Sequence, residues 1–326
     1  MATAEQLKSL IRSHLDNDRE RFLTTALQLA AHEARMGHSS VAEDIRFLVD
    51  KAKSNKTRVV QTHRELDELV ATSEPHLRIS DLIVTASLQE RIQRIKREYH
   101  QQTKLKKHGL RNRRKILLMG PPGTGKTMTA AALAGELSLP LYTILMERII
   151  TKFMGETSAK LRQIFDVLAE HRGVYLFDEF DAIGAERSRD DDVGEMRRVL
   201  NSFLQFLEQD DSDSLIVAIT NNPRILDQAL FRRFDDVLHY SLPTRHEIGQ
   251  LIASRLGAFA DNDFASVALL EEAASLSHAE ITQACDDAIK EAILSDKEKI
   301  TEGLLQNMLG ERRQVYRVSA SNKEQE

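Results

Sequence analysis

The sequence predicts an α/β fold in which a parallel β-sheet is flanked by helical regions. Three observations support this prediction. Short, continuous apolar runs recur between residues 116 and 240, as is typical of parallel strands buried on both faces. A glycine-rich turn follows the first run and leads into a helix-forming segment, residues 129–137. Apolar residues at helical spacing occupy both ends of the chain, residues 1–54 and 244–316.

The composition is that of a globular protein with two or three domains. The chain has 326 residues, 41% apolar and 29% charged, and a formal net charge of −5, which gives no overall bias toward nucleic acid. The single cysteine, Cys285, argues against an internal disulfide framework and favours a reducing, cytoplasmic location. No apolar run reaches membrane-spanning length and residues 1–6 do not resemble a secretion signal, so no membrane partner is expected.

The N-terminal region, residues 1–54, is expected to form a small bundle of three helices. Gly37 separates the last helix from the second. The apolar positions at helical spacing are Leu7, Leu10, Ile11, Leu15, Phe22, Leu23, Ala26, Leu27, Ala30, Val41, Ile45, Leu48 and Val49. Such a bundle either binds a partner or substrate or only stiffens the N-terminus. Residues 55–77, which are polar and contain Pro75, are expected to be a linker.

A strongly basic segment, residues 91–115, carries eleven lysines and arginines against the single acid Glu98. One function for it is contact with nucleic acid. The alternative is a solvated helix surface or a face that meets an acidic neighbour. The alternative is favoured, because Tyr99 is the only aromatic residue interleaved for base stacking.

The glycine-rich turn has the chemistry of a phosphate-binding loop. The motif G-x-x-x-x-G-K-[ST] is filled by Gly120, Pro121, Pro122, Gly123, Thr124, Gly125, Lys126 and Thr127, between the strand 116–119 and a helix. Inward-pointing backbone N–H groups and the helix N-terminus form a cradle for anions. Lys126 supplies a positive charge for the β- and γ-phosphates, and the Thr127 hydroxyl is placed to ligate Mg²⁺.

Two further buried strands are followed by polar residues. The run 173–177 leads directly to Asp178 and Glu179. Asp178 is placed to hold Mg²⁺ through water, and Glu179 to orient and deprotonate the attacking water. The run 215–219 is followed by Thr220 and Asn221, which is expected to touch the γ-phosphate or the water. Other strands are expected at 140–145 and 237–240.

Two segments leave a choice between structural and functional interpretations. Arg232 and Arg233 lie between apolar residues, and are either surface charges or arginine fingers, which stabilise charge on the transferred phosphoryl group. Phe153 and Met154 precede Gly155, and are either core residues or an exposed grip on another chain.

The region after Pro243 is helical throughout. Ser277 and Glu280 stand three apart before an apolar run, as in a capping box. A last helix is expected at roughly 300–309. The polar residues 317–326 are expected to be a disordered tail.

Taken together and in this order, the motifs resemble those of the AAA family of ATPases, with similarity to its spastin-, katanin- and FtsH-like modules. The resemblance covers roughly residues 78–312. It implies a P-loop NTPase fold with a five-stranded parallel sheet in a large domain, 78–243, and a four-helix lid, 244–316. It also implies that ATP and Mg²⁺ bind between these domains, and that the chain forms homo-oligomeric rings, usually hexamers.

The resemblance further implies roles for individual residues. Asn221 matches the first sensor, and Arg232 and Arg233 match arginine fingers that reach the neighbouring subunit's nucleotide. Phe153 and Met154 match the loop that grips a polypeptide in the ring's channel, and the acidic segment 186–195 matches a second such loop. The residues expected near the nucleotide besides the phosphate loop are Ile83, Met128, His278 and Ala279, with His278-Ala279 where the family often has Gly-Ala.

The chain also departs from the family. Its two arginines are adjacent in a short segment, and Glu208-Gln-Asp-Asp replaces the frequent Asp-Gly-Phe. The sequence thus predicts an ATP-hydrolysing ring that remodels, unfolds or threads proteins. The alternatives are a nucleic-acid-associated ATPase and a nucleotide-gated scaffold. The chain carries no His-Glu-x-x-His protease motif, so any protease or adaptor would be a separate protein.

Overall fold

The computed structural model describes residues 8, 19–38, 41–46, 49, 69–149, 154–180, 192–222, 231–261, 264 and 266–323. The chain divides into two compact units, residues 1–67 and 68–326, each described by itself. Within the described residues, no helix is long and apolar enough to cross a membrane.

The first unit contains α2 (Arg19–Arg35), and Gly37, two residues beyond its end, has φ +87°. Residues 41–46 are again helical, and Nδ1 of His38 lies 2.7 Å from a carboxylate oxygen of Glu33. Small buried residues, Ala26, Ala30 and Ala42, allow close packing here. The residues of the first predicted apolar stripe, Leu7, Leu10, Ile11 and Leu15, lie outside the described residues.

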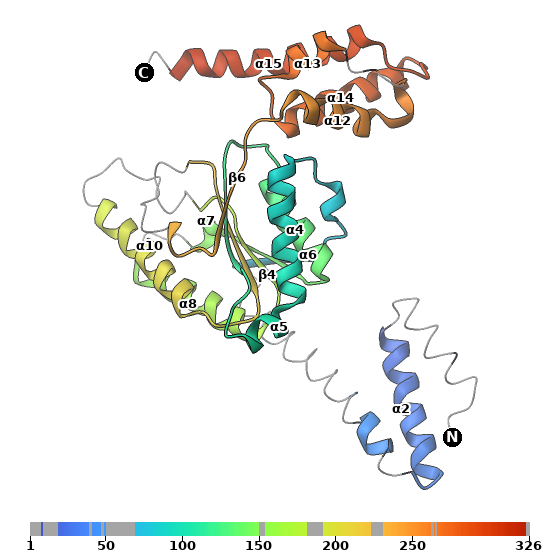
Figure 1. Ribbon diagram of the computed structural model, residues 1–326, viewed down its shortest axis with the longest axis vertical. Helices are drawn as coiled ribbons and strands as arrows, with labels where there is room; N and C mark the ends of the chain where they lie inside the picture. Colours follow the sequence, from blue (N-terminus) through green and yellow to red (C-terminus); the bar gives the residue numbers. More distant parts are fainter. Residues whose placement is uncertain are drawn as a thin grey trace. The chain divides into compact units, whose positions relative to one another are not determined.

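The second unit is built on a six-stranded sheet in the order β1-β3-β4-β5-β2-β6 (Figure 1). The five predicted strands are β2 (Lys115–Met119), β3 (Leu141–Ile144), β4 (Val174–Phe177), β5 (Leu215–Thr220) and β6 (Asp236–His239). They are parallel to one another. A sixth strand, β1 (Val70–Ser73), pairs antiparallel with β3. It lies in the segment 55–77, which the sequence predicted to be a linker.

Helices cover both faces of this sheet (Figure 1). On one face α4 (Ala86–His100) and α6 (Lys126–Leu137) share a core cluster with Leu118, Leu176 and Val217 of the strands. On the other face α8 (Met154–Glu170) and α10 (Asp192–Gln209) pack together. There Phe177 meets Phe203 at 5.1 Å between ring centroids. Alternate strand residues thus point to opposite faces, and both are buried. The short elements are η1 (Ile79–Asp81), α5 (Gln102–Lys107) and α7 (Met146–Ile149).

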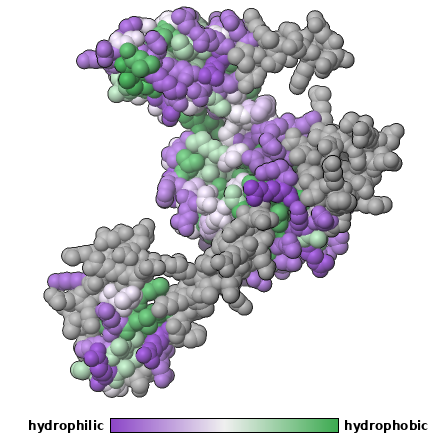
Figure 2. All heavy atoms as spheres, turned by 180° about the vertical axis from the view of Figure 1, so that it is seen from behind, coloured by the Kyte–Doolittle hydropathy of each residue, from purple (hydrophilic) through white to green (hydrophobic). Residues whose placement is uncertain are grey.

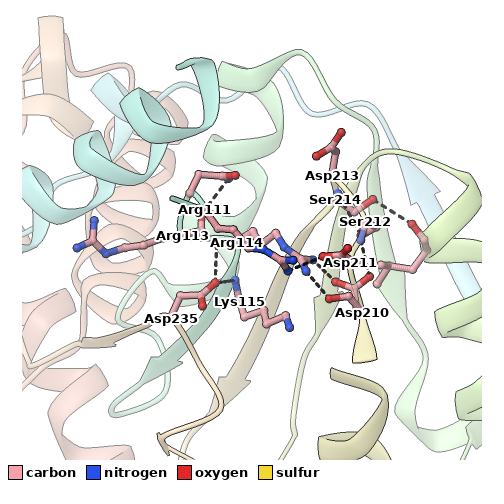
Figure 3. A network of polar contacts seen from close by, with 12 residues as sticks. Arg111, Arg113, Arg114, Lys115, Asp210, Asp211, Ser212, Asp213, Ser214 and Asp235 are labelled. Carbon is pink, nitrogen blue, oxygen red and sulfur yellow. Dashed lines mark hydrogen bonds and ion pairs between the residues drawn. The ribbon is translucent and has the colours of Figure 1, made fainter. Parts of the chain in front are cut away.

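The basic segment is largely neutralised by acidic neighbours. Arg114 is buried and pairs with Asp210, while its backbone N–H donates to Asp235 at 2.9 Å (Figure 3). Similar pairs join Arg91 to Asp236, Lys96 to Glu136, Lys106 to Asp213, Arg111 to Asp211 and Arg113 to Glu98. The contacts of Arg111 and Arg114 tie the segment at the start of β2 to the segments before β5 and β6. They favour the acidic-neighbour interpretation of residues 91–115.

The C-terminal part of the second unit is a lid of helices. It contains α12 (Arg245–Leu256), the short η3 (Gly257–Phe259), α13 (Val267–Ala273), α14 (His278–Leu294) and α15 (Glu302–Lys323). The predicted capping box is present: Ser277 Oγ accepts from the N–H of Glu280, whose carboxylate accepts from the N–H of Ser277. The lid has its own core, which includes Ile252, Leu269, Ile281 and Leu305.

The last helix differs from the sequence expectation. We expected it to end near residue 309 and residues 317–326 to be disordered, but α15 continues to Lys323. The lid surface seen in Figure 2 is mostly hydrophilic, with hydrophobic residues gathered at one end. Among the lid's described residues, Val267, Ile293 and Leu294 are the large apolar side chains that are more than half exposed.

Candidate active site

A cavity of about 680 Å³ lies where the sheet domain meets the lid, within the usual size range of small-molecule sites. One side is the phosphate loop and the residues that follow β4 and β5. The segment before α4 and the helices α12 and α14 form the rest. Most of the predicted site residues line it: Ile83, Pro122, Gly123, Thr124, Gly125, Lys126, Thr127, Met128, Asp178, Glu179, Asn221, His278 and Ala279.

The phosphate loop can adopt its shape only because glycines stand at its turns. Gly120 has φ +147°, and a Cβ there would lie 2.2 Å from the carbonyl oxygen of Tyr240. Gly123 has φ +71°, and its Cβ would lie 2.5 Å from Oγ of Ser277. The loop ends at Gly125, the residue before α6. Because Gly125, Lys126 and Thr127 line the cavity, the N-terminus of α6 faces it and can bind an anion.

Lys126 is folded into this loop. The residue is 5% exposed, and its Nζ donates to the carbonyl oxygens of Gly120 at 2.8 Å and Pro121 at 2.6 Å. Gly120 and Pro121 do not line the cavity themselves but position this ammonium. A buried ammonium at the start of α6, beside the helix N-terminus, suits a polyphosphate.

Thr127 and Asp178 meet at the edge of the cavity. The Thr127 hydroxyl donates to Oδ2 of Asp178 at 2.8 Å. A hydroxyl and a carboxylate side by side are hard oxygen ligands of the kind that Mg²⁺ prefers. The residues present therefore fit a magnesium ion held by Thr127 directly and by Asp178 through water.

Glu179 has an unusual backbone conformation for a residue with a side chain. Its φ is +51°, in the left-handed region. Its N–H donates to Oδ1 of Asp178 at 2.8 Å, and the next N–H, of Phe180, donates to Ile219 at 2.9 Å. The carboxylate is exposed and lines the cavity. Strained backbone at such a position is typical of functional sites.

The lid contacts the phosphate loop directly. The N–H of Ala279 donates to the carbonyl oxygen of Gly123 at 3.0 Å. His278 precedes it at the start of α14. Burial lowers the pKa of the His278 imidazole, while the charge of Glu247 and the backbone of Ile83 oppose this shift. The ring is therefore neutral at neutral pH, since the ordinary pKa of histidine is already below 7.

Not every predicted residue lies at the cavity. Arg232 and Arg233 are exposed outside it, and Arg233 pairs with Glu208. Phe153 and most of the segment 186–195 lie outside the described residues. The backbone of Met154 begins α8.

Part of the lid wall was not predicted from the sequence, namely Leu251, Ser254, Arg255, Thr282 and Gln283. Arg255 reaches Asp286 with both its Nε and Nη2, the latter at 2.8 Å. No sequence motif marks these residues, because they belong to two lid helices whose other faces form the lid core.

The fold and this cavity define a P-loop nucleotide hydrolase with a helical lid. The family described as "ATPase family associated with various cellular activities (AAA)" matches residues 116–242. A protein from Sinorhizobium fredii described as an uncharacterized AAA family ATPase is 30% identical over 311 residues, 93% of each chain. The chain belongs to the AAA family of ATPases. It therefore hydrolyses ATP.

Other relatives are similar over a shorter region. A proteasome-activating nucleotidase of Methanopyrus kandleri is 35% identical over 196 residues, 57% of this chain and 44% of that protein. A probable 26S proteasome regulatory subunit 10B of Caenorhabditis elegans is 31% identical over 204 residues, 59% of this chain and 50% of that protein. The chain thus spans about half the length of these proteasome-type relatives.

Proposed function

We propose that the protein is a ring-forming ATPase, assembled as a hexamer, that uses ATP hydrolysis to remodel or unfold polypeptides. One observation carries the proposal. The cavity is lined by the phosphate loop, Thr127, Asp178 and Glu179, but Arg232 and Arg233 lie on the surface outside it. A second copy of the chain can bring them to the phosphates, and one copy leaves the site without them.

Hydrolysis follows from the residues in the cavity. The loop N–H groups and Lys126 would hold the β- and γ-phosphates, and Thr127 and Asp178 would hold a magnesium ion, which supplies positive charge to those phosphates when bound. Glu179 accepts a proton from water that attacks the γ-phosphorus, while Asn221 orients the water or the γ-phosphate. An arginine of the neighbouring copy stabilises the charge that develops on the transferred group. Such a residue contributes about 10³- to 10⁵-fold to the rate.

The polypeptide substrate is proposed from two features. The proteasome-activating names of the relatives support it, as does the sequence Phe153-Met154-Gly155, which follows β3 along the chain and in which Met154 begins α8. An aromatic and a thioether side chain grip extended chains of many sequences, because both contacts are apolar and adaptable. Nucleic acid is not proposed, since six of the basic residues in 91–115 have acidic partners.

Subunit mixing tests whether the site is shared between copies. An Arg233→Ala copy keeps the general base Glu179 in its own pocket but supplies no arginine finger to its neighbour's pocket. A Glu179→Gln copy supplies the arginine finger but lacks the general base in its own pocket. Each variant alone should have little turnover, and a mixture should regain activity because a Glu179→Gln copy completes an Arg233→Ala pocket. Arg245→Ala, which removes another exposed, ion-paired arginine, is the matched control and should turn over normally.

Two results would contradict the shared site. One is full turnover by Arg233→Ala, and the other is a mixture no more active than its parts. The substrate proposal has its own test: Phe153→Ala should retain basal ATP hydrolysis but lose stimulation by an unfolded protein. Stimulation by DNA with a steep salt dependence would instead favour a nucleic-acid function.

A further inference from the structure

Tyr240 contacts the phosphate loop but is not among the residues that line the cavity. It follows β6, and its N–H donates to the carbonyl oxygen of Met119, the last residue of β2, at 2.7 Å. The loop begins at the next residue, Gly120, which packs so closely on Tyr240 that a Cβ there would lie 2.9 Å from the Cβ of the tyrosine. The main chain of Tyr240 is therefore fixed against the start of the loop.

The side chain of Tyr240 reaches the other end of the loop. Its hydroxyl donates to Oγ1 of Thr129 at 2.7 Å. The hydroxyl of Thr129 in turn donates to the carbonyl oxygen of Gly125 at 3.0 Å, and the N–H of Thr129 donates to the same oxygen at 2.9 Å. Gly125 is the last glycine of the loop and has φ +92°. Two hydrogen bonds in series thus join the Tyr240 hydroxyl to the end of the loop.

Both hydroxyls are shielded from water. Thr129 is fully buried and Tyr240 is 6% exposed. Burial raises the pKa of the Tyr240 hydroxyl, which therefore stays protonated and remains a donor near neutral pH. Hydrogen bonds in series in a buried environment strengthen one another. An apolar side chain could fill the same space, so the hydroxyls add orientation to the packing that the ring provides.

We propose that Tyr240 is a positioning residue that fixes the two ends of the phosphate loop relative to each other, and so keeps the loop in the shape that binds the phosphates of ATP. The proposal rests on ATP binding in this cavity. The glycines that let the loop curl also give it access to other shapes, because glycine has the widest choice of backbone conformations. A protein that only partly populates its binding-competent shape has its affinity reduced by that fraction. The hydrogen bonds from Tyr240 to Gly125 raise this fraction from outside the cavity.

The experiment compares the loss of one hydroxyl at two buried tyrosines. Tyr240→Phe removes the donor at the loop. Tyr175→Phe is the matched control, because the buried Tyr175 hydroxyl donates to the carbonyl oxygen of His171 at 2.9 Å, away from the loop. ATP affinity is measured by displacement of a fluorescent nucleotide from the full chain, and Tm is measured without nucleotide.

Both variants should have a slightly lower Tm, but only Tyr240→Phe should lose ATP affinity. The expected loss is about 3- to 10-fold, as one neutral hydrogen bond provides. Turnover of Tyr240→Phe at saturating ATP should stay within about twofold of the wild type. An interaction that contributes equally to the bound state and the transition state changes KM and leaves kcat unaltered.

Substitutions at Thr129 test the series of hydrogen bonds. Thr129→Ser keeps the hydroxyl and should bind ATP as the wild type does. Thr129→Val removes the hydroxyl at nearly constant size and should lose as much ATP affinity as Tyr240→Phe. The double variant Tyr240→Phe/Thr129→Val should lose no more than either single variant, because each change already interrupts the series.

Three results would overturn the proposal. Equal ATP affinity in the wild type and Tyr240→Phe would show that the hydroxyl contributes only to stability. If Tyr240→Phe failed to fold, unchanged ATP affinity in Thr129→Val would lead to the same conclusion. Additive losses in the double variant would show that the two hydroxyls act independently. Failure of the ATP site itself gives a different result, since Lys126→Ala would then bind ATP as tightly as the wild type.

Discussion

The hydroxyl of Thr127 donates a 2.8 Å hydrogen bond to Oδ2 of Asp178, 51 positions along the chain. The two residues follow β2 and β4, which are separated in the sheet by β5. The contact therefore depends on the order of three strands and not on local sequence. It brings together the two side chains that would share a magnesium ion.

The first prediction concerns this pair. Asp178→Asn keeps the size of the side chain but removes its charge, so magnesium affinity should fall by about 10- to 100-fold, as for other residues that hold a metal through water. Turnover at limiting Mg²⁺ should fall accordingly and recover in part at high Mg²⁺. Titration of ATPase activity with Mg²⁺ measures this. An unchanged magnesium dependence would contradict the assignment of Asp178.

The second prediction separates the chemistry of Glu179 from its strained backbone. Glu179→Gln and Glu179→Gly should both lose about 10²- to 10⁴-fold in turnover, because each removes the general base. Only the Glu179→Gly variant should be more stable to unfolding than the wild type, since glycine adopts a φ of +51° without steric cost. A gain of about 1 kcal/mol corresponds to a rise in Tm of roughly 2–4 °C in a unit of this size. Thermal unfolding of the wild type and the two variants without nucleotide measures this change in Tm. A Glu179→Gly variant with a Tm no higher than that of Glu179→Gln would contradict the argument that the backbone is strained.

The third prediction concerns the single cysteine. Cys285 is fully buried in the lid core, and burial, with the nearby charge of Asp286, raises the pKa of its thiol to about 12. The reactive thiolate is therefore scarce at pH 8. Alkylation by iodoacetamide should be roughly 100-fold or more slower in the native protein than in guanidinium chloride, because it requires the lid to open. Fast labelling of the native protein would show that the lid core is open in solution.

The fourth prediction concerns acid stability of the lid. Asp287 accepts hydrogen bonds from Lys290 at 2.9 Å and Gln283 at 3.1 Å, and it also pairs with Arg312. The Lys290 contact is the largest cause that lowers the pKa of Asp287 to about 2. A carboxylate with a lowered pKa stabilises the fold above its ordinary value near 4, and this stabilisation is lost as the pH falls toward 2.

Asp287→Asn should therefore lower the Tm at pH 7 and have progressively less effect as the pH is reduced from 5 to 3. Thermal unfolding of both proteins across that range measures the difference. Asp261→Asn, at a largely exposed ion pair with Lys299, is a control expected to change stability little. A difference in Tm between the wild type and Asp287→Asn that stays constant with pH would contradict the link between protonation of Asp287 and stability.

The sequence predicted the parts of the fold that carry strong local signals. The runs 116–119, 174–177 and 215–219 became central strands because they are buried on both faces and so contain few polar residues. The capping box at Ser277 and Glu280 depends on two residues three positions apart, and it is present. The phosphate loop was predicted for the same reason, since its chemistry lies within eight consecutive residues.

The missed elements have weak or non-local signals. Strand β1 is a short edge strand, and three of its four residues are exposed, so Val-Ala-Thr-Ser shows no apolar pattern. In the continuation of α15, the apolar residues Val315, Tyr316 and Val318 are followed by the mostly polar residues 319–323, so no apolar stripe reaches Lys323. Arg255 lines the cavity, but its partner Asp286 is 31 positions away on another helix. Only the folded lid brings such residues together.

The bond between the N–H of Ala279 and the carbonyl of Gly123 makes the lid part of the loop that would hold the phosphates. A movement of the lid away from the sheet domain must either break this hydrogen bond or displace the phosphate loop with it. A neighbouring molecule that pushes on α12 or α14 would thereby alter the grip on nucleotide without touching it. This hydrogen bond therefore offers one route by which a displacement of the lid would change the binding of nucleotide.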